Sequence, residues 1–180
     1  MSASTTLKLG DPAPDFSLAG VDGTVHRLAD FHNNPVLCVI FMCNHCPYVK
    51  ATIDRLITVQ RDYVARGVQL IGINANETTN YPEDALPHMV QWARAKGFNF
   101  PYLRDATQAV ARAYGAERTP QIFLFDQKRM LRYTGAIDDN VQAPTKVTRH
   151  YLRDAIDALL QDQPVKDVET HAVGCSIKWA

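Results

Sequence analysis

Two cysteines separated by two residues, Cys43 and Cys46, have the clearest chemical meaning in this sequence. A cysteine attacks as its thiolate, whereas a free thiol titrates near ~8.5 and is mostly protonated at neutral pH. The segment Cys43–Pro47 follows an apolar run and precedes a helical pattern. This position predicts that Cys43 lies at a helix N-terminus, where free amide hydrogens and the helix dipole stabilise a thiolate.

The residues around the two cysteines fit the same interpretation. His45 adds positive charge when it is protonated, and Pro47 suits a first helical turn because its missing N–H would have no partner there. Two intervening residues, Asn44 and His45, leave the sulfurs close enough for a reversible disulfide. We expect Cys43 to attack a partner and Cys46 to resolve the mixed disulfide, with Asn44, His45 and Pro47 shaping the site.

Two other interpretations of the cysteine pair stay open. The pair can simply pack in the core, or it can form half of a metal site. His171 and Cys175 have ligand-like spacing, and with Cys43 and Cys46 they would complete a Cys₃His zinc set. A copper(I) site is a variant of this idea. The alternative function is therefore a zinc- or copper(I)-binding protein without catalysis.

The remaining two cysteines carry different expectations. Cys38 lies inside the apolar run before the motif, and we expect it in the core. Cys175 lies in the C-terminal tail, where it is either a third redox cysteine or a buried anchor beside Trp179. Four cysteines in a chain of this length do not form a disulfide scaffold, so a reducing compartment is expected.

The elements that position the pair follow from hydrophobic periodicity. Pro35–Met42 is typical of a strand buried on both faces, and Tyr48–Arg66 has helical spacing that ends at Gly67. Strands and helices alternate along the chain, which predicts an α/β fold with a partly parallel sheet and helices on both faces. Further elements are expected as follows: a hairpin around Asp22-Gly23, strands at 68–73, 100–103, 121–125 and 130–137, and helices at 84–96, 107–114 and 147–160.

Length and charge limit the remaining possibilities. The 180 residues predict one domain, 1–180, in which 161–180 is a tail without clear periodicity. Lysine plus arginine equals aspartate plus glutamate, 19 each, which argues against nucleic-acid and anionic-membrane partners and permits a homodimer. The first ten residues lack a signal-like apolar core, so we expect a cytoplasmic protein. The sequence has no glycine-rich phosphate loop of standard form, and no cofactor is expected.

Several segments resemble a known group. Gly10-Asp-Pro-Ala-Pro-Asp-Phe-Ser-Leu18 resembles the opening of the redoxin and peroxiredoxin (AhpC/TSA-like) branch of the thioredoxin superfamily. A bacterial peroxiredoxin-like group has segments similar to Cys43–Lys50, Asn80–Asp84, Thr119-Pro120 and Gly174–Trp179. The resemblance implies a thioredoxin-like fold, with an N-terminal hairpin, a central mixed sheet and a C-terminal extension. It also implies that Pro120, after Thr119, is a cis-proline opposite a redox-active dithiol.

The chain departs from the families that it resembles at several positions, and these departures decide which activity we expect first. Leu37 stands where thioredoxin has a buried aspartate, so we expect the disulfide to be resolved by another base or less efficiently. Pro120 falls where peroxiredoxins carry an arginine, for which Arg118 is a possible auxiliary, and Glu77 is a possible base. Thiol–disulfide exchange therefore ranks above a thiol-dependent, antioxidant peroxidase. The implied partners are a protein or small-molecule disulfide, or a hydroperoxide, together with a cellular thiol reductant.

Overall fold

The computed structural model describes residues 6–180; the first five residues, part of the stretch expected to lack a targeting signal, lie outside it. Over these residues a seven-stranded sheet has the order β2-β1-β5-β4-β3-β7-β8. Strands β3, β4 and β5 run parallel, and the other pairings are antiparallel. The strands are β1 (Ser17–Gly20), β2 (Val25–Arg27), β3 (Val36–Phe41), β4 (Val68–Asn74), β5 (Tyr102–Arg104), β7 (Gln121–Phe125) and β8 (Leu131–Gly135).

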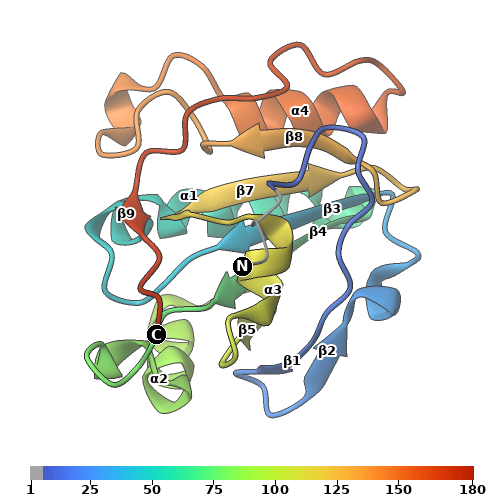
Figure 1. Ribbon diagram of the computed structural model, residues 1–180. Coiled ribbons are helices and arrows are strands. Elements are labelled where there is room, and N and C mark those ends of the chain that lie inside the picture. The colour runs from blue at the N-terminus through green and yellow to red at the C-terminus, as the bar shows by residue number, and fades with distance from the viewer. Residues whose placement is uncertain (1–5) are drawn as a thin grey trace.

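Helices cover both faces of this sheet, which confirms the expected mixed α/β architecture (Figure 1). Alternation along β3 builds the two layers, because successive side chains of a strand point to opposite faces. Cys38 and Ile40 join the core under α1 (Pro47–Tyr63), α2 (Leu86–Lys96) and α4 (Tyr151–Leu160). Leu37 and Val39 join the core under α3 (Ala109–Tyr114). Cys38 is fully buried, as expected for a core residue.

The segment from β3 to β4 has the form that the sequence predicts. Helix α1 begins at Pro47, continues as a short 3-10 turn over Val64–Arg66, and ends at Gly67. Gly67 has a φ of 83°, a left-handed conformation in which glycine is favoured. None of the helices between residues 6 and 180 is long and apolar enough to cross a membrane.

Three helices begin later than the sequence pattern suggests, among them α3, which was expected from residue 107 and begins at Ala109. The helix expected from residue 147 begins at Tyr151, because Asp139 accepts hydrogen bonds from Thr148 and its own N–H bonds the Arg149 carbonyl, which holds this segment as a loop. The helix expected from residue 84 begins at Leu86. Asp84 instead ends a 3-10 turn, Pro82–Asp84, and is buried rather than exposed in the first turn of α2.

The C-terminal tail is ordered by contacts along its length rather than by an internal period. Val168 and Thr170 bond the backbone of Thr134 at the edge strand β8. Further on, β9 (Cys175–Ser176) pairs antiparallel with β6 (Arg118–Thr119) in a second, two-stranded sheet. Figure 1 shows β9 on the side of the molecule toward which the β3 arrow points. Strands of two residues carry no periodic signal, so the sequence did not predict this sheet.

Gly174 allows the tail to approach β6 closely, and this contact leads to a testable prediction. A Cβ on Gly174 would lie 2.0 Å from the carbonyl oxygen of Thr119. Gly174→Ala should therefore push β9 off β6 and lower the free energy of unfolding by about 1–3 kcal/mol, as overpacking does elsewhere. Denaturant melts compare the free energy of unfolding of Gly174→Ala with that of Gly10→Ala. A Cβ on Gly10 would meet nothing within 4 Å. Gly10 has a positive φ, 87°, and Gly174 does not, so a loss in Gly10→Ala measures backbone strain without crowding; a Gly174→Ala protein as stable as the wild type would contradict the steric argument.

Candidate active site

The two cysteines of the motif lie where β3 ends and α1 begins. Cys43 and Cys46 are free thiols, and both side chains are fully buried. Helix α1 begins at Pro47, in the first turn as expected, so the residue that caps its N-terminus is Cys46. The expectation that Cys43 holds this position was wrong. The unpaired amides of the first turn therefore act most strongly on Cys46.

Thr119 and Pro120 lie against both sulfurs. The Thr119–Pro120 peptide bond is cis, which confirms the expectation from the resemblance. The hydroxyl oxygen of Thr119 is 3.6 Å from the Cys43 sulfur. Its carbonyl oxygen accepts a hydrogen bond from the Cys46 thiol at 3.3 Å. One residue thus holds both members of the pair.

Cys175 lies next to the dithiol. It is the register partner of Thr119 in the β6–β9 pair, and its half-buried side chain packs against the cluster that contains Cys43 and Cys46. Trp179, the expected neighbour of Cys175, is 39% exposed and its ring lies 4.4 Å from the Arg112 guanidinium. The tail therefore brings a third sulfur to the site.

Asp84 is a buried acid of the site that sequence reasoning missed. Its side chain is fully buried, and a buried carboxylate is costly unless donors surround it. Its Oδ1 accepts from the Asn44 backbone N–H at 2.6 Å and from the Asn74 amide at 3.2 Å. Its Oδ2 accepts from the Asn76 amide at 3.0 Å and bonds Nδ1 of His45.

These contacts orient the two residues between the cysteines. The His45 ring is bonded to Asp84 and stacks on Tyr81 with 5.2 Å between ring centroids. Asn44 accepts a hydrogen bond from the buried Tyr102 hydroxyl at 2.8 Å. Ligand atoms of Cys43, His45 and Asp84 lie within 4.8 Å of one another. A histidine and a buried carboxylate are thus within a short distance of one sulfur.

The neighbours of the two sulfurs move their pKa values in opposite directions. Hydrogen bonding from Cys43, together with bonds from Cys175 and the Val49 backbone, lowers the pKa of Cys46 to about 4 although burial opposes this. The same bond to Cys46, burial and the negative charge of Asp84 raise the pKa of Cys43. The Thr119 carbonyl can only accept, so its bond to Cys46 exists in the thiol form. Cys46, the residue at the N-cap position of α1, is therefore the more acidic of the pair.

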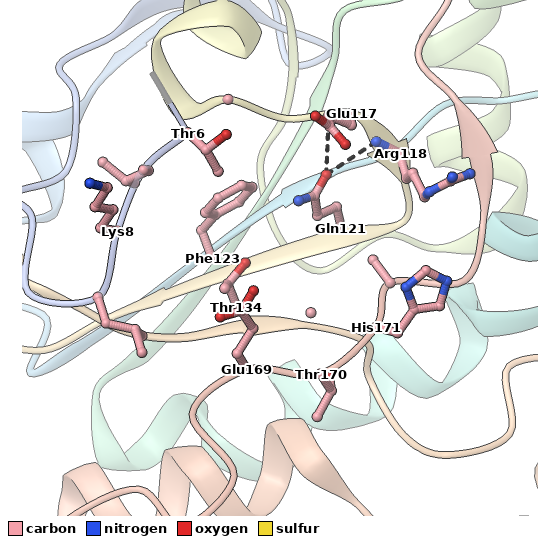
Figure 2. Close-up of a pocket in the computed structure, with 15 residues that line it drawn as sticks. Thr6, Lys8, Glu117, Arg118, Gln121, Phe123, Thr134, Glu169, Thr170 and His171 are labelled. Atoms are coloured by element: carbon pink, nitrogen blue, oxygen red, sulfur yellow. Dashed lines mark hydrogen bonds between the residues drawn. The ribbon is translucent and has the colours of Figure 1, made fainter. Parts of the chain in front are cut away.

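The two expected auxiliary residues and one expected metal ligand lie outside this site. Arg118 is exposed and its guanidinium donates to the Gly174 carbonyl at 3.3 Å, so it binds the tail rather than either sulfur. The carboxylate of Glu77 accepts from the backbone of Thr79 and Asn80 in its own loop. His171 lines a separate groove of about 890 Å³ with Arg118 (Figure 2). For Arg118 and Glu77, position along the chain could be predicted from sequence, but the direction of the side chain could not.

The expected Cys₃His metal set is not assembled among residues 6–180. His171 does not join the cysteines in a group of close ligand atoms, and the group that does form is Cys43, His45 and Asp84. Asp84 already accepts hydrogen bonds from three amide donors besides its bond to His45. These donors occupy the carboxylate oxygens that a metal would need. The geometry thus fits an acid–base group better than a ligand set.

A sequence signal for the missed residues did exist. Asn74 ends β4 and Asn76 follows it, and functional side chains of open α/β sheets gather beyond the carboxyl ends of strands. Applying that rule to β4 as well as β3 would have selected these asparagines. Asp84 is harder to find, because its helical surroundings in the sequence suggested a solvated first turn.

The sheet order, the dithiol at the start of α1 and the cis-proline opposite it together define a thioredoxin-fold protein. The more particular assignment comes from sequence: residues 9–134 match the AhpC/TSA family, and the chain belongs to that family. The match ends in β8, so α4 and the tail with β9 lie beyond it.

Similar proteins include a solved structure and two relatives found by sequence. A crystal structure of a hypothetical protein from Sinorhizobium meliloti is 39% identical, with a TM-score of 0.92 over 98% of this chain and 97% of that one. The thiol-disulfide oxidoreductase ResA of Geobacillus thermodenitrificans is 28% identical over 68% of this chain and 66% of its own length, just under two thirds. A putative peroxiredoxin of Mycobacterium tuberculosis is 26% identical over 83% of this chain and 94% of its own.

Proposed function

We propose that this protein is a thiol–disulfide oxidoreductase whose redox couple is Cys43 and Cys46. The observation that carries the proposal is the pair itself: two free thiols at the start of α1, both held by Thr119 beside a cis-proline. A thiolate stabilised at a helix N-terminus next to a second thiol is the arrangement that disulfide exchange requires.

The reaction exchanges two electrons. The sequence predicts Cys43 as the attacking sulfur, but we assign the attack to Cys46 because its pKa is lowered. The Cys46 thiolate attacks one sulfur of a partner disulfide, which forms a mixed disulfide and releases the other partner sulfur as a thiolate. Cys43 then loses its proton and attacks Cys46, which releases the second partner sulfur and leaves a Cys43–Cys46 disulfide. The partner gains two electrons and the pair loses two. A cellular thiol reductant returns the pair to the dithiol.

Asp84 and His45 supply the base that this sequence lacks at Leu37. The second step needs Cys43 as a thiolate, and its pKa is raised by burial and by its bond to Cys46. A ring nitrogen of His45 lies within 4.8 Å of the Cys43 sulfur, and Asp84 holds that ring in place. His45 therefore takes the proton from Cys43, and Asp84 stabilises the imidazolium that results.

A thiol-dependent peroxidase is the second candidate, and the acidity of Cys46 favours it. In that reaction the Cys46 thiolate attacks the O–O bond, which releases an alcohol or water and leaves a sulfenic acid. Cys43 then displaces water and forms the same disulfide. Arg118 binds the tail instead of approaching Cys46, so a guanidinium to stabilise the leaving oxygen is missing there. We therefore rank disulfide exchange first.

A redox titration tests the couple directly. Metal-stripped wild-type protein and Cys43→Ser are equilibrated across a series of glutathione ratios, and free thiols are alkylated and located by peptide mass. We expect the wild type to lose Cys43 and Cys46 together in one two-electron transition, whereas any disulfide that forms in the variant must use other cysteines. A wild type that keeps both thiols over the whole series would refute the proposal, and metal analysis of untreated protein would then follow. Added hydroperoxide with a thiol donor measures the second candidate.

We further propose a cytoplasmic location and leave a homodimer as a prediction. A formal net charge of zero, at pI ≈ 7.0, gives little repulsion between copies. Fractionation of cells carrying the full chain, and sedimentation of the purified protein, measure these two properties.

A further inference from the structure

We propose that Cys175 is a third redox sulfur, which passes the disulfide between the buried pair and the outside through a Cys46–Cys175 bond. This inference rests on the proposed function and extends it, because it assigns the route by which the partner or the reductant reaches a dithiol that solvent does not contact.

The placement of Cys175 beside Cys46 is fixed by strand pairing. Cys175 is opposite Thr119 in the β6–β9 pair, and Thr119 is the residue whose carbonyl bonds the Cys46 thiol. The close approach of Gly174 to the Thr119 carbonyl fixes this register, because no larger residue fits there. Ile177, two residues after Cys175, is buried in the core under α3 and holds the other end of the strand. Both sides of Cys175 are therefore anchored.

Burial differs between the three sulfurs in a way that gives Cys175 a role. Cys43 and Cys46 have no exposed surface, whereas Cys175 is half-buried. The strand β9 thus lies between the dithiol and solvent, and its own cysteine is the sulfur of the three that an outside molecule can contact. A disulfide that includes Cys175 is open to attack without removal of the tail.

The relay is a thiol–disulfide exchange in which atoms and electrons balance. When the pair is oxidised, the Cys175 thiolate attacks the Cys46 sulfur, which forms Cys46–Cys175, breaks Cys43–Cys46 and releases the Cys43 thiolate. The thiol reductant then attacks Cys175, forms a mixed disulfide with it and releases the Cys46 thiolate. A second reductant thiol completes the reduction, so the reductant loses two electrons and the three cysteines end as thiols.

Oxidation of the pair also prepares Cys175 for this attack. Burial, hydrogen bonding to Cys46 and the negative charge of Cys46 raise the pKa of Cys175 to about 11 in the reduced protein, while Lys178 opposes this. In the Cys43–Cys46 disulfide the charge on Cys46 is gone and one cause of the raised pKa disappears with it. Cys175 therefore ionises more readily when there is a disulfide for it to attack.

Disulfide mapping and reduction kinetics test the relay. In Cys43→Ser the pair cannot form, so we expect glutathione disulfide to produce a Cys46–Cys175 bond, which peptide mass identifies and which Cys43→Ser/Cys175→Ser lacks. In Cys175→Ser we expect reduction of the oxidised protein by dithiothreitol to slow by about tenfold or more, since the accessible sulfur is lost. Ser176→Ala, an exposed change in the same strand, should keep the wild-type rate.

The outcomes separate the relay from the proposed function. A Cys43→Ser protein that forms no Cys46–Cys175 bond, together with wild-type reduction rates in Cys175→Ser, overturns the relay and leaves the Cys43–Cys46 couple intact. A wild type that never forms Cys43–Cys46 overturns the couple itself. Cys175→Ala repeats the kinetic measurement if the serine variant folds poorly, and the mapping in Cys43→Ser leaves β9 unchanged.

Discussion

Cys46→Ser should abolish disulfide exchange and, with it, the thiolate that the protein carries at neutral pH. Cys46 caps α1, and hydrogen bonding from Cys43 lowers its pKa to about 4. A group with a depressed pKa stays ionised as pH falls until that value is reached, so wild-type thiolate absorbance should persist from neutral pH down to about 4. In Cys46→Ser a cause that remains for Cys38, Cys43 and Cys175 is burial, which raises the pKa of each, so the absorbance should appear only in alkali.

Two replacements of Cys43 test whether hydrogen bonding from Cys43 lowers the pKa of Cys46. Cys43→Ser keeps a hydroxyl that can donate to the Cys46 sulfur, whereas Cys43→Ala removes the donor that contributes most to the low pKa. Both variants should lose turnover by about 10³-fold or more, as with other nucleophile partners. The pKa of Cys46 should rise further in the alanine variant than in the serine variant. A thiolate that survives in Cys46→Ser would instead assign the attack to Cys43.

Asp84→Asn should slow turnover by about 10- to 100-fold, at the lower end of the range for a displaced acid–base group. The substitution removes a buried charge with little change in shape, and Asp84 holds the His45 ring near Cys43. Since the negative charge of Asp84 helps to raise the pKa of Cys43, its removal should move the alkylation profile of Cys43, followed in Cys46→Ser, toward lower pH. The turnover rate and the pKa of Cys43 should thus both fall.

Glu83→Gln is the matched control for Asp84→Asn. It removes the same charge one residue away, from a side chain that is 48% exposed and whose carboxylate lies 3.9 Å from His45 Nδ1. Solvent screens such a charge, so Glu83→Gln should keep nearly the wild-type turnover and the wild-type pH profile of Cys43 alkylation. If Asp84→Asn lowered stability but left the pH profile of Cys43 unchanged, Asp84 would have a structural role alone.

The sequence was informative where one local signal determines the structure. The run ending at Met42, the proline at position 47 and the stop at Gly67 place the dithiol between a buried strand and a helix, and the structure has this arrangement. Thr119-Pro120 could be placed because the resemblance supplied its conformation. In each case the deciding residues lie within a few positions of one another.

The parts that the sequence did not predict depend on contacts between distant residues. Asp84 reaches the site only because a turn before α2 packs its side chain onto Asn44 and Asn76. The pairing of Cys175 with Thr119 joins residues 56 positions apart through two-residue strands. The helix was expected from Tyr48 and begins at Pro47, so the error was to place Cys43, four residues earlier, at its N-terminus.

The four cysteines lie in different parts of the structure, so their labelling rates can report how readily each part opens. Cys38 lies at the centre of the sheet, Cys43 and Cys46 lie beneath β9, and Cys175 is half-buried. A small alkylating reagent labels a buried thiol only while the structure around it is open, so each labelling rate reports a separate opening free energy. Cys175 should label first, the pair upon detachment of the tail, and Cys38 only upon global unfolding. Local release of the strand can thus be measured apart from unfolding of the domain, without adding any probe to the protein.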